Sequence, residues 1–145
     1  MHQAEETSRI STIIGLVFEG LGMFLTLSFA AGINVANAID EQMFLDEGFT
    51  ASEAEMLMNI VDVLGIVLLV LGGILLVVFL VNLVLFKKLL NGRFDPETAG
   101  NIYLYQIIWG AINLFFNQIA GILYLISGIK GKTTQKKHLN DKQTQ

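Results

Sequence analysis

One acid and a few amides are the residues whose types and spacing could support chemistry within an apolar stretch. Glu19 lies inside the first long apolar run, ten residues from Arg9, the nearest basic residue in the sequence. An acid near the middle of a membrane span costs roughly 2.5–3.5 kcal/mol on insertion scales, so it is a functional candidate by default. Without a basic partner, we expect Glu19 to be protonated and to hydrogen-bond amides on other helices. The candidate amides are Asn82, Gln106, Asn113 and Asn117.

Three of these amides form a polar stripe. Gln106, Asn113 and Asn117 are spaced by seven and then four residues, which places them on one face of a helix. At the sequence level two interpretations of the stripe and Glu19 stay open. The groups either hydrogen-bond across a helical bundle and fix its register, or line a path for protons, ions or a small molecule. Aromatic residues are expected to pack or to mark the membrane interface, namely Tyr103, Tyr105, Trp109 and Tyr124.

Other kinds of chemistry lack their residues. The sequence has no cysteine, and its two histidines, His2 and His138, lie in the terminal segments. A cysteine or histidine metal site and a histidine base at the depth of Glu19 are therefore excluded. We predict no catalytic residue, no metal, no cofactor and no enzyme activity. The net charge of −4 argues against nucleic-acid binding, which needs clustered basic residues.

The elements that must position Glu19 and the stripe are apolar helices. Hydrophobic residues make up 53% of the 145 residues and charged residues 15%, where a soluble domain has about one quarter charged. Ser52 and Glu55 have the spacing of a capping box. We predict an all-α fold, an integral membrane four-helix bundle, in a single domain over 1–130 with a basic, disordered cytoplasmic tail over 131–145. The predicted helices are 10–38, 52–90, 96–116 and 118–130.

The number of spans follows from charge, because hydropathy alone leaves three long transmembrane helices as an alternative. Lys and Arg collect on the cytoplasmic side of a membrane, and the acidic loop 40–56 has neither. Four spans place all nine Lys and Arg inside and this loop outside, whereas three spans would place the basic tail outside. We therefore predict four spans, cytoplasmic termini and an external turn near 116–118. The last span is short, since 118–130 gives only about 20 Å of helix.

Pairs of glycines seven residues apart recur in three of the apolar runs. Small residues let helix backbones approach closely in lipid, where helices gain nothing from hydrophobic burial against each other. We predict that these glycines pack helices, with a homo-oligomer interface as the alternative. The pairs are Gly15 and Gly22, Gly65 and Gly72, and Gly121 and Gly128.

The order of features resembles a known family. An acidic loop runs into a long apolar helix, Lys87-Lys88 is followed by Asn91-Gly92 and Asp95-Pro96, and the segment AGILYLISGIK over 120–130 precedes a basic tail. This order is similar to that of small four-helix membrane proteins of Gram-positive bacteria, a domain-of-unknown-function family. The resemblance implies a bacterial cytoplasmic-membrane location and four helices, and it implies no activity. Glu19 and the short last helix depart from the family pattern.

We therefore predict a small non-enzymatic integral membrane protein with an accessory, regulatory or envelope-protection role. The alternative is a small oligomeric transporter or channel that uses Glu19 and the polar stripe. The expected partners are the lipid bilayer and either further copies of the chain or a larger membrane protein.

Overall fold

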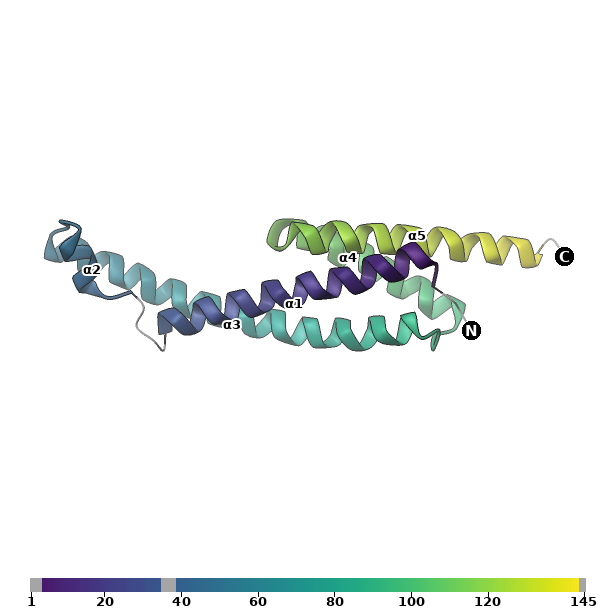
Figure 1. The fold of residues 1–145 in the computed structure, drawn as a ribbon, viewed down its shortest axis with the longest axis horizontal. Helices are drawn as coiled ribbons and strands as arrows, with labels where there is room; N and C mark the ends of the chain where they lie inside the picture. Colours follow the sequence, from purple (N-terminus) through teal and green to yellow (C-terminus); the bar gives the residue numbers. More distant parts are fainter. Residues whose placement is uncertain (1–3, 35–38, 144–145) are drawn as a thin grey trace. The chain divides into compact units, whose positions relative to one another are not determined.

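The structure, a computed structural model, describes residues 4–34 and 39–143, and these residues are helical apart from short turns (Figure 1). The all-α fold class is confirmed. The helices in chain order are α1 (Glu6–Asn34), α2 (Glu41–Asp46), α3 (Ala51–Leu90), α4 (Pro96–Phe116) and α5 (Gln118–Gln143).

Local capping chemistry explains where the helices begin and end. Asp95 Oδ1 accepts hydrogen bonds from the N–H groups of Glu97 and Thr98, at 3.1 and 3.0 Å, and Pro96 opens α4. Gly92, with φ of 64°, makes the turn after α3 that an L side chain would resist. The observed bounds of α4 match the predicted helix 96–116.

The capping box that starts α3 lies two residues earlier than the sequence predicts. Thr50 Oγ1 accepts the Glu53 N–H at 3.4 Å, and Glu53 Oε2 accepts the Thr50 N–H at 2.9 Å. Thr50 and Glu53 have the same spacing as Ser52 and Glu55, so spacing alone could not choose between the two pairs. Before it, the predicted acidic loop contains the short helix α2, whose N-cap is Asp40.

The chain divides into two compact units. The first, here called the bundle unit, comprises Met1–Leu21 and Phe79–Gln145 and therefore takes parts of α1 and α3 together with α4 and α5. The second unit comprises Gly22–Val78. In the bundle unit α4 and α5 run antiparallel and side by side (Figure 1), joined by a turn at Asn117. The bundle unit is thus built from four helical segments.

Burial in the described residues is inverted relative to a water-soluble domain. Large apolar side chains lie outside, and Phe115 is 89% exposed. Polar side chains lie inside the bundle unit, where Thr12, Asn82 and Gln106 are fully buried. The described apolar core of the bundle unit is small and has two groups, Phe86 with Ala120 and Tyr124, and Leu89 with Ala99 and Tyr103.

Glycines permit close backbone approach at several helix contacts. A Cβ on Gly121 would lie 2.7 Å from the Leu114 nitrogen, and one on Gly128 would lie 2.7 Å from the Tyr103 carbonyl oxygen. Both contacts join α5 to α4. In the second unit, Gly65 and Gly72 of α3 meet the α1 side chains Ile33 and Leu27. Gly22 is half-buried, and its carbonyl accepts the Thr26 hydroxyl.

Helix α5 continues to Gln143, well beyond the predicted end at 130. The sequence predicts disorder over 131–145 because of its polar composition, but the first part of this segment has a packing partner. Gly131 lies against the Tyr103 ring, and Gln135 is buried beside Gly100. Lys and Gln are also good helix formers. Helix α1 likewise begins at Glu6 instead of 10, and the predicted residues 35–38 lie outside the described part.

Two helices of the described residues are long and apolar enough to cross a membrane. These are α1 and α3, with mean hydropathies of 1.9 and 3.2 in their most apolar windows. Only 17% and 11% of those windows is buried, so their apolar surface faces outward instead of filling a protein core. Among the described helices, α4 and α5 are not in this group.

Candidate functional site at Glu19

Glu19 is bound by one donor from each of the other three helices of the bundle unit. Its side chain is 6% exposed. Oε1 accepts hydrogen bonds from Asn82 Nδ2 of α3 and Trp109 Nε1 of α4, both at 2.8 Å, and Oε2 accepts the Tyr124 hydroxyl of α5. This single carboxyl group of α1 therefore connects four helical segments. We call these four residues the Glu19 clamp.

Neighbouring residues hold the clamp in position. The Tyr105 hydroxyl donates to Asn82 Oδ1 at 2.6 Å, which turns the amide so that Nδ2 faces Glu19. The Tyr124 ring packs on Phe86, with ring centroids 5.3 Å apart, and lies over Gly15. A Cβ on Gly15 would lie 2.8 Å from Tyr124 Cε1, so glycine leaves room for the ring that reaches the acid.

All three partners of Glu19 are neutral donors, and within the described residues no Lys, Arg or His bonds to it. The indole N–H can only donate, and the Asn82 oxygen is already occupied by Tyr105. Oε1 thus accepts from two N–H donors, and Oε2 meets a hydroxyl group. Of the amides expected as partners, Asn82 is the one that bonds to Glu19 among the described residues. The other two partners are aromatic side chains on α4 and α5.

Gln106 belongs to a separate buried network. Its Nε2 donates to Thr12 Oγ1 at 3.1 Å, and its Oε1 accepts from Ser127 Oγ at 3.0 Å. Thr12 and Ser127 approach each other at 2.6 Å, and Ser8 Oγ donates to the Ser127 carbonyl at 3.0 Å. Since Thr12 precedes Glu19 by seven residues, this network lies about 10 Å from the acid along α1.

The other two amides of the stripe also make contacts of their own. Asn113 Nδ2 donates to the Trp109 carbonyl of the same helix at 3.2 Å. Asn117 Nδ2 donates to the Phe18 carbonyl at 2.6 Å, and its Oδ1 accepts the Ala120 N–H at the start of α5. Each amide of the stripe therefore has its own separate partners, and within the described residues none of them hydrogen-bonds Glu19.

Sequence reasoning missed the aromatic donors and the small hydroxyl residues. Trp109 and Tyr124 were expected to pack or to mark an interface, yet both donate to Glu19. A usable signal existed, because an acid in an apolar run without a base needs neutral donors, and Trp and Tyr can supply them. Ser8 and Ser127 carried no comparable signal in the sequence.

No family model, curated protein or solved structure matches this chain. The described residues also contain no group of three or more His, Cys, Asp or Glu side chains that could hold a metal ion. The site must therefore be interpreted from its own chemistry. That chemistry is a buried acceptor satisfied by three donors on three helices.

Proposed function

We propose that this chain is a small non-enzymatic integral membrane protein with an accessory or regulatory role, in which the Glu19 clamp fastens the bundle unit. The observation that carries the proposal is that both carboxyl oxygens of Glu19 are hydrogen-bonded to side chains of neighbouring helices. Each donor that reaches Glu19 comes from a different helix, and the three amides of the polar stripe are occupied elsewhere. The contacts of Glu19, Gln106 and Asn117 join α1 to other segments, whereas Asn113 bonds within α4, so the described polar groups are divided among separate contacts.

The inverted burial supports a membrane location. Helices in lipid associate through small residues and interhelical hydrogen bonds, since lipid tails solvate apolar side chains well. Buried polar groups beside exposed apolar ones follow this pattern, and α1 and α3 have the length and hydropathy of spans. The bacterial cytoplasmic membrane is the location that the family resemblance implies.

The position along α1 at which the α4–α5 turn is attached supports a change to the predicted four-span topology. In the changed topology, α4 and α5 form a hairpin that enters the membrane and turns back. The turn between them is tied to the Phe18 carbonyl by Asn117. Phe18 is nine residues from Arg9, or about 14 Å along the helix, whereas the hydrocarbon core is about 30 Å thick. Helix α1 itself continues another 16 residues to Asn34. The turn would therefore lie inside the bilayer.

Charge and length agree with this re-entrant hairpin. Residues 63–81 of α3, which precede Asn82, contain no charged or amide residue, so the Glu19 clamp would lie towards the cytoplasmic end of the span. A hairpin that returns keeps all nine Lys and Arg on the cytoplasmic side, as the four-span arrangement does. It also removes the length problem, because the short apolar segment 118–130 no longer has to cross.

A second candidate function is proton-coupled or cation-coupled transport through Glu19. The observation in its favour is that the acid has only neutral partners, so a proton or cation could bind without displacing a resident positive group. The test compares wild-type protein and Glu19→Gln in proteoliposomes. Our proposal expects both to insert and neither to carry coupled flux. Flux in the wild type that is lost in a normally inserted Glu19→Gln would replace our proposal with transport.

A further inference from the structure

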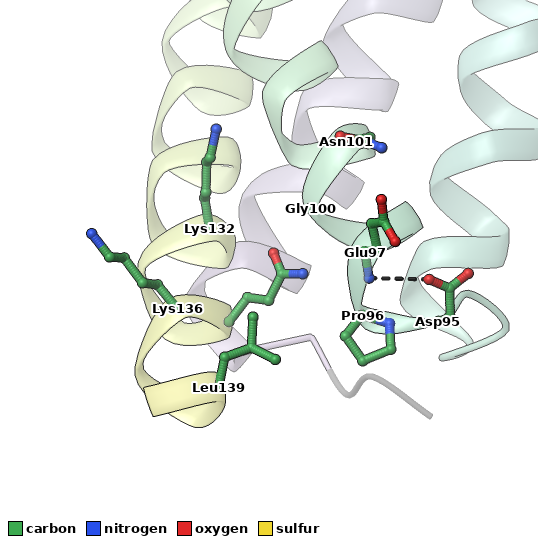
Figure 2. Close-up of a pocket in the computed structure, with 9 residues that line it drawn as sticks. Asp95, Pro96, Glu97, Gly100, Asn101, Lys132, Lys136 and Leu139 are labelled. Carbon is green, nitrogen blue, oxygen red and sulfur yellow. Dashed lines mark hydrogen bonds between the residues drawn. The ribbon is translucent and has the colours of Figure 1, made fainter. Parts of the chain in front are cut away.

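A pocket unrelated to the Glu19 clamp lies between the first turns of α4 and the last part of α5. Its volume is about 630 Å³. In Figure 2, Lys132 and Lys136 come from α5 on one side of the pocket, and Glu97 of α4 and its N-cap residue Asp95 lie on the other. Both helices belong to the bundle unit. We call this site the α4–α5 pocket.

The α5 side of the pocket offers donors. Lys132 and Lys136 are four residues apart, so they share a helix face, and each ammonium group sits on a flexible four-carbon stem. Gln135 also lines the pocket and is only 7% exposed. Its amide lies over Gly100, where a Cβ would be 2.6 Å from Oε1. Within residues 4–34 and 39–143, no hydrogen bond to this amide is found and no fully buried side-chain nitrogen or oxygen lacks a partner, so the small exposed part of Gln135 includes its amide and faces the pocket.

The α4 side offers the carboxylate of Glu97 as an acceptor, because the carboxylate of Asp95 already caps the helix. Asp95 caps α4, and hydrogen bonds from the Thr98 hydroxyl and nearby N–H groups hold the pKa of its carboxyl below the ordinary value. Glu97 is exposed on the same rim. The lining of the pocket therefore combines two lysines and an amide from α5 with an exposed carboxylate from α4.

We propose that the α4–α5 pocket binds the headgroup of a glycerophospholipid from the cytoplasmic leaflet. Lys132 and Lys136 hold the phosphodiester, Gln135 donates to one of its oxygens, and Glu97 accepts from a hydroxyl or amine of the outer substituent. The site lies where the apolar part of α5 ends at Ile129 and the basic part begins. This boundary is where hydrocarbon gives way to headgroups in the membrane placement proposed above, on which the assignment rests.

The test measures retained lipid on the purified full-length protein in detergent by native mass spectrometry, with phosphatidylglycerol as the probe. The double variant Lys132→Gln/Lys136→Gln should retain about thirtyfold less phosphatidylglycerol, since each basic residue near an anionic headgroup adds about fivefold to the affinity. The matched control is Lys130→Gln/Lys137→Gln, which removes the same charge from α5 outside the pocket. This control should bind like the wild type, within about twofold.

Two further arms identify the source of the phosphate. Phosphatidylcholine, whose outer substituent has no hydrogen-bond donor, should bind more weakly than phosphatidylglycerol, and millimolar inorganic phosphate should not displace the lipid. Equal losses in the two double variants would reduce the effect to diffuse charge and overturn the pocket assignment. Displacement by inorganic phosphate would overturn the lipid assignment. Carbonate extraction of membranes tests insertion separately, so failure of lipid binding in an inserted protein refutes only the pocket.

Discussion

The substitution Glu19→Leu tests the Glu19 clamp directly. Leucine fills a similar volume but accepts no hydrogen bond, so Asn82, Trp109 and Tyr124 would each lose an acceptor. All three donors lie within the bundle unit, and Asn82 and Tyr124 are fully buried. Water is not at hand to replace the lost acceptor at fully buried positions. The prediction is a bundle unit that still inserts but separates more readily.

The magnitude follows from the number of contacts. Interhelical polar contacts in a membrane average about 0.6 kcal/mol and reach about 1.7 kcal/mol, so three contacts amount to about 2–5 kcal/mol. Orphaned donors in soluble proteins cost about 1–3 kcal/mol each, but helices that separate within lipid find other partners, so the lower scale applies. The cost of inserting Glu19 is present in both the assembled and the separated helices, and it does not offset the loss.

Trp109 supplies the assay because it is the single tryptophan of the chain and its indole N–H donates to Glu19. When unfolding of the detergent-solubilised protein is followed by Trp109 emission, Glu19→Leu should have a free energy of unfolding about 2–5 kcal/mol below that of the wild type. Glu19→Gln should lose less than about 2 kcal/mol, because its oxygen still accepts from Asn82 and Trp109 and only the Tyr124 contact must reverse.

A leucine control on the same helix separates the clamp from general effects on α1. Val17 is 56% exposed, so Val17→Leu should unfold like the wild type. The clamp would be refuted if Glu19→Leu were as stable as Glu19→Gln. It would also be refuted if Trp109 emission were identical in the native states of the wild type, Glu19→Leu and Glu19→Gln.

Three further predictions concern topology, packing and pH. A cysteine at Gln118, in a chain with no other cysteine, should resist impermeant maleimides from outside while one in the loop 40–56 reacts; external labelling of Gln118→Cys would restore the four-span arrangement. Gly15→Leu should destabilise the bundle because its Cβ would meet a ring atom at 2.8 Å, whereas Gly73→Leu, with no atom within 4 Å, should be tolerated in a thermal-unfolding comparison. The hydrogen bonds that cap α4 lower the pKa of Asp95 in the folded protein. The cap should therefore stabilise α4 fully at pH values above 3.8, the ordinary pKa of an aspartate, and this stabilisation should be lost as the pH falls through the folded pKa. The loss should appear as faster amide exchange in the first turn of α4.

The parts of the fold that the sequence predicted well are those fixed by local chemistry. Asp95 and Pro96 define the start of α4 because an N-cap side chain and a first-turn proline act only on backbone groups up to three residues away. The continuation of α5 could not be predicted this way. It depends on Gly131 meeting Tyr103, and these residues are brought together only by the antiparallel packing of α4 and α5.

The candidate site was predictable in kind but not in its contacts. Helical spacing places Gln106 and Asn113 on one face of α4, while Asn117 lies in the turn that ends it. Spacing carries no information on the position along a neighbouring helix at which each amide meets its partner. Gln106 lies beside Thr12, about 10 Å along α1 from Glu19, while Asn117 is next to the Phe18 carbonyl. The shift of one helix along its axis relative to its neighbour determines which residues become partners. Close contacts such as that of Gly121 with Leu114 set this shift.

The glycines and the acid therefore act on the same structure. Gly15 admits the Tyr124 ring, and the ring carries the hydroxyl that reaches Glu19, so a packing position and a polar position depend on one another. The second unit differs, because its described side-chain hydrogen bonds stay within single helices or at caps, as with Thr26 and Asn34. Specific association of helices then combines polar contacts with glycine packing in the bundle unit, and in the second unit it rests on glycine packing and buried apolar residues such as Ala30 and Ala54. Substitutions that remove a hydrogen-bonding side chain should accordingly weaken helix association more in the bundle unit than in the second unit.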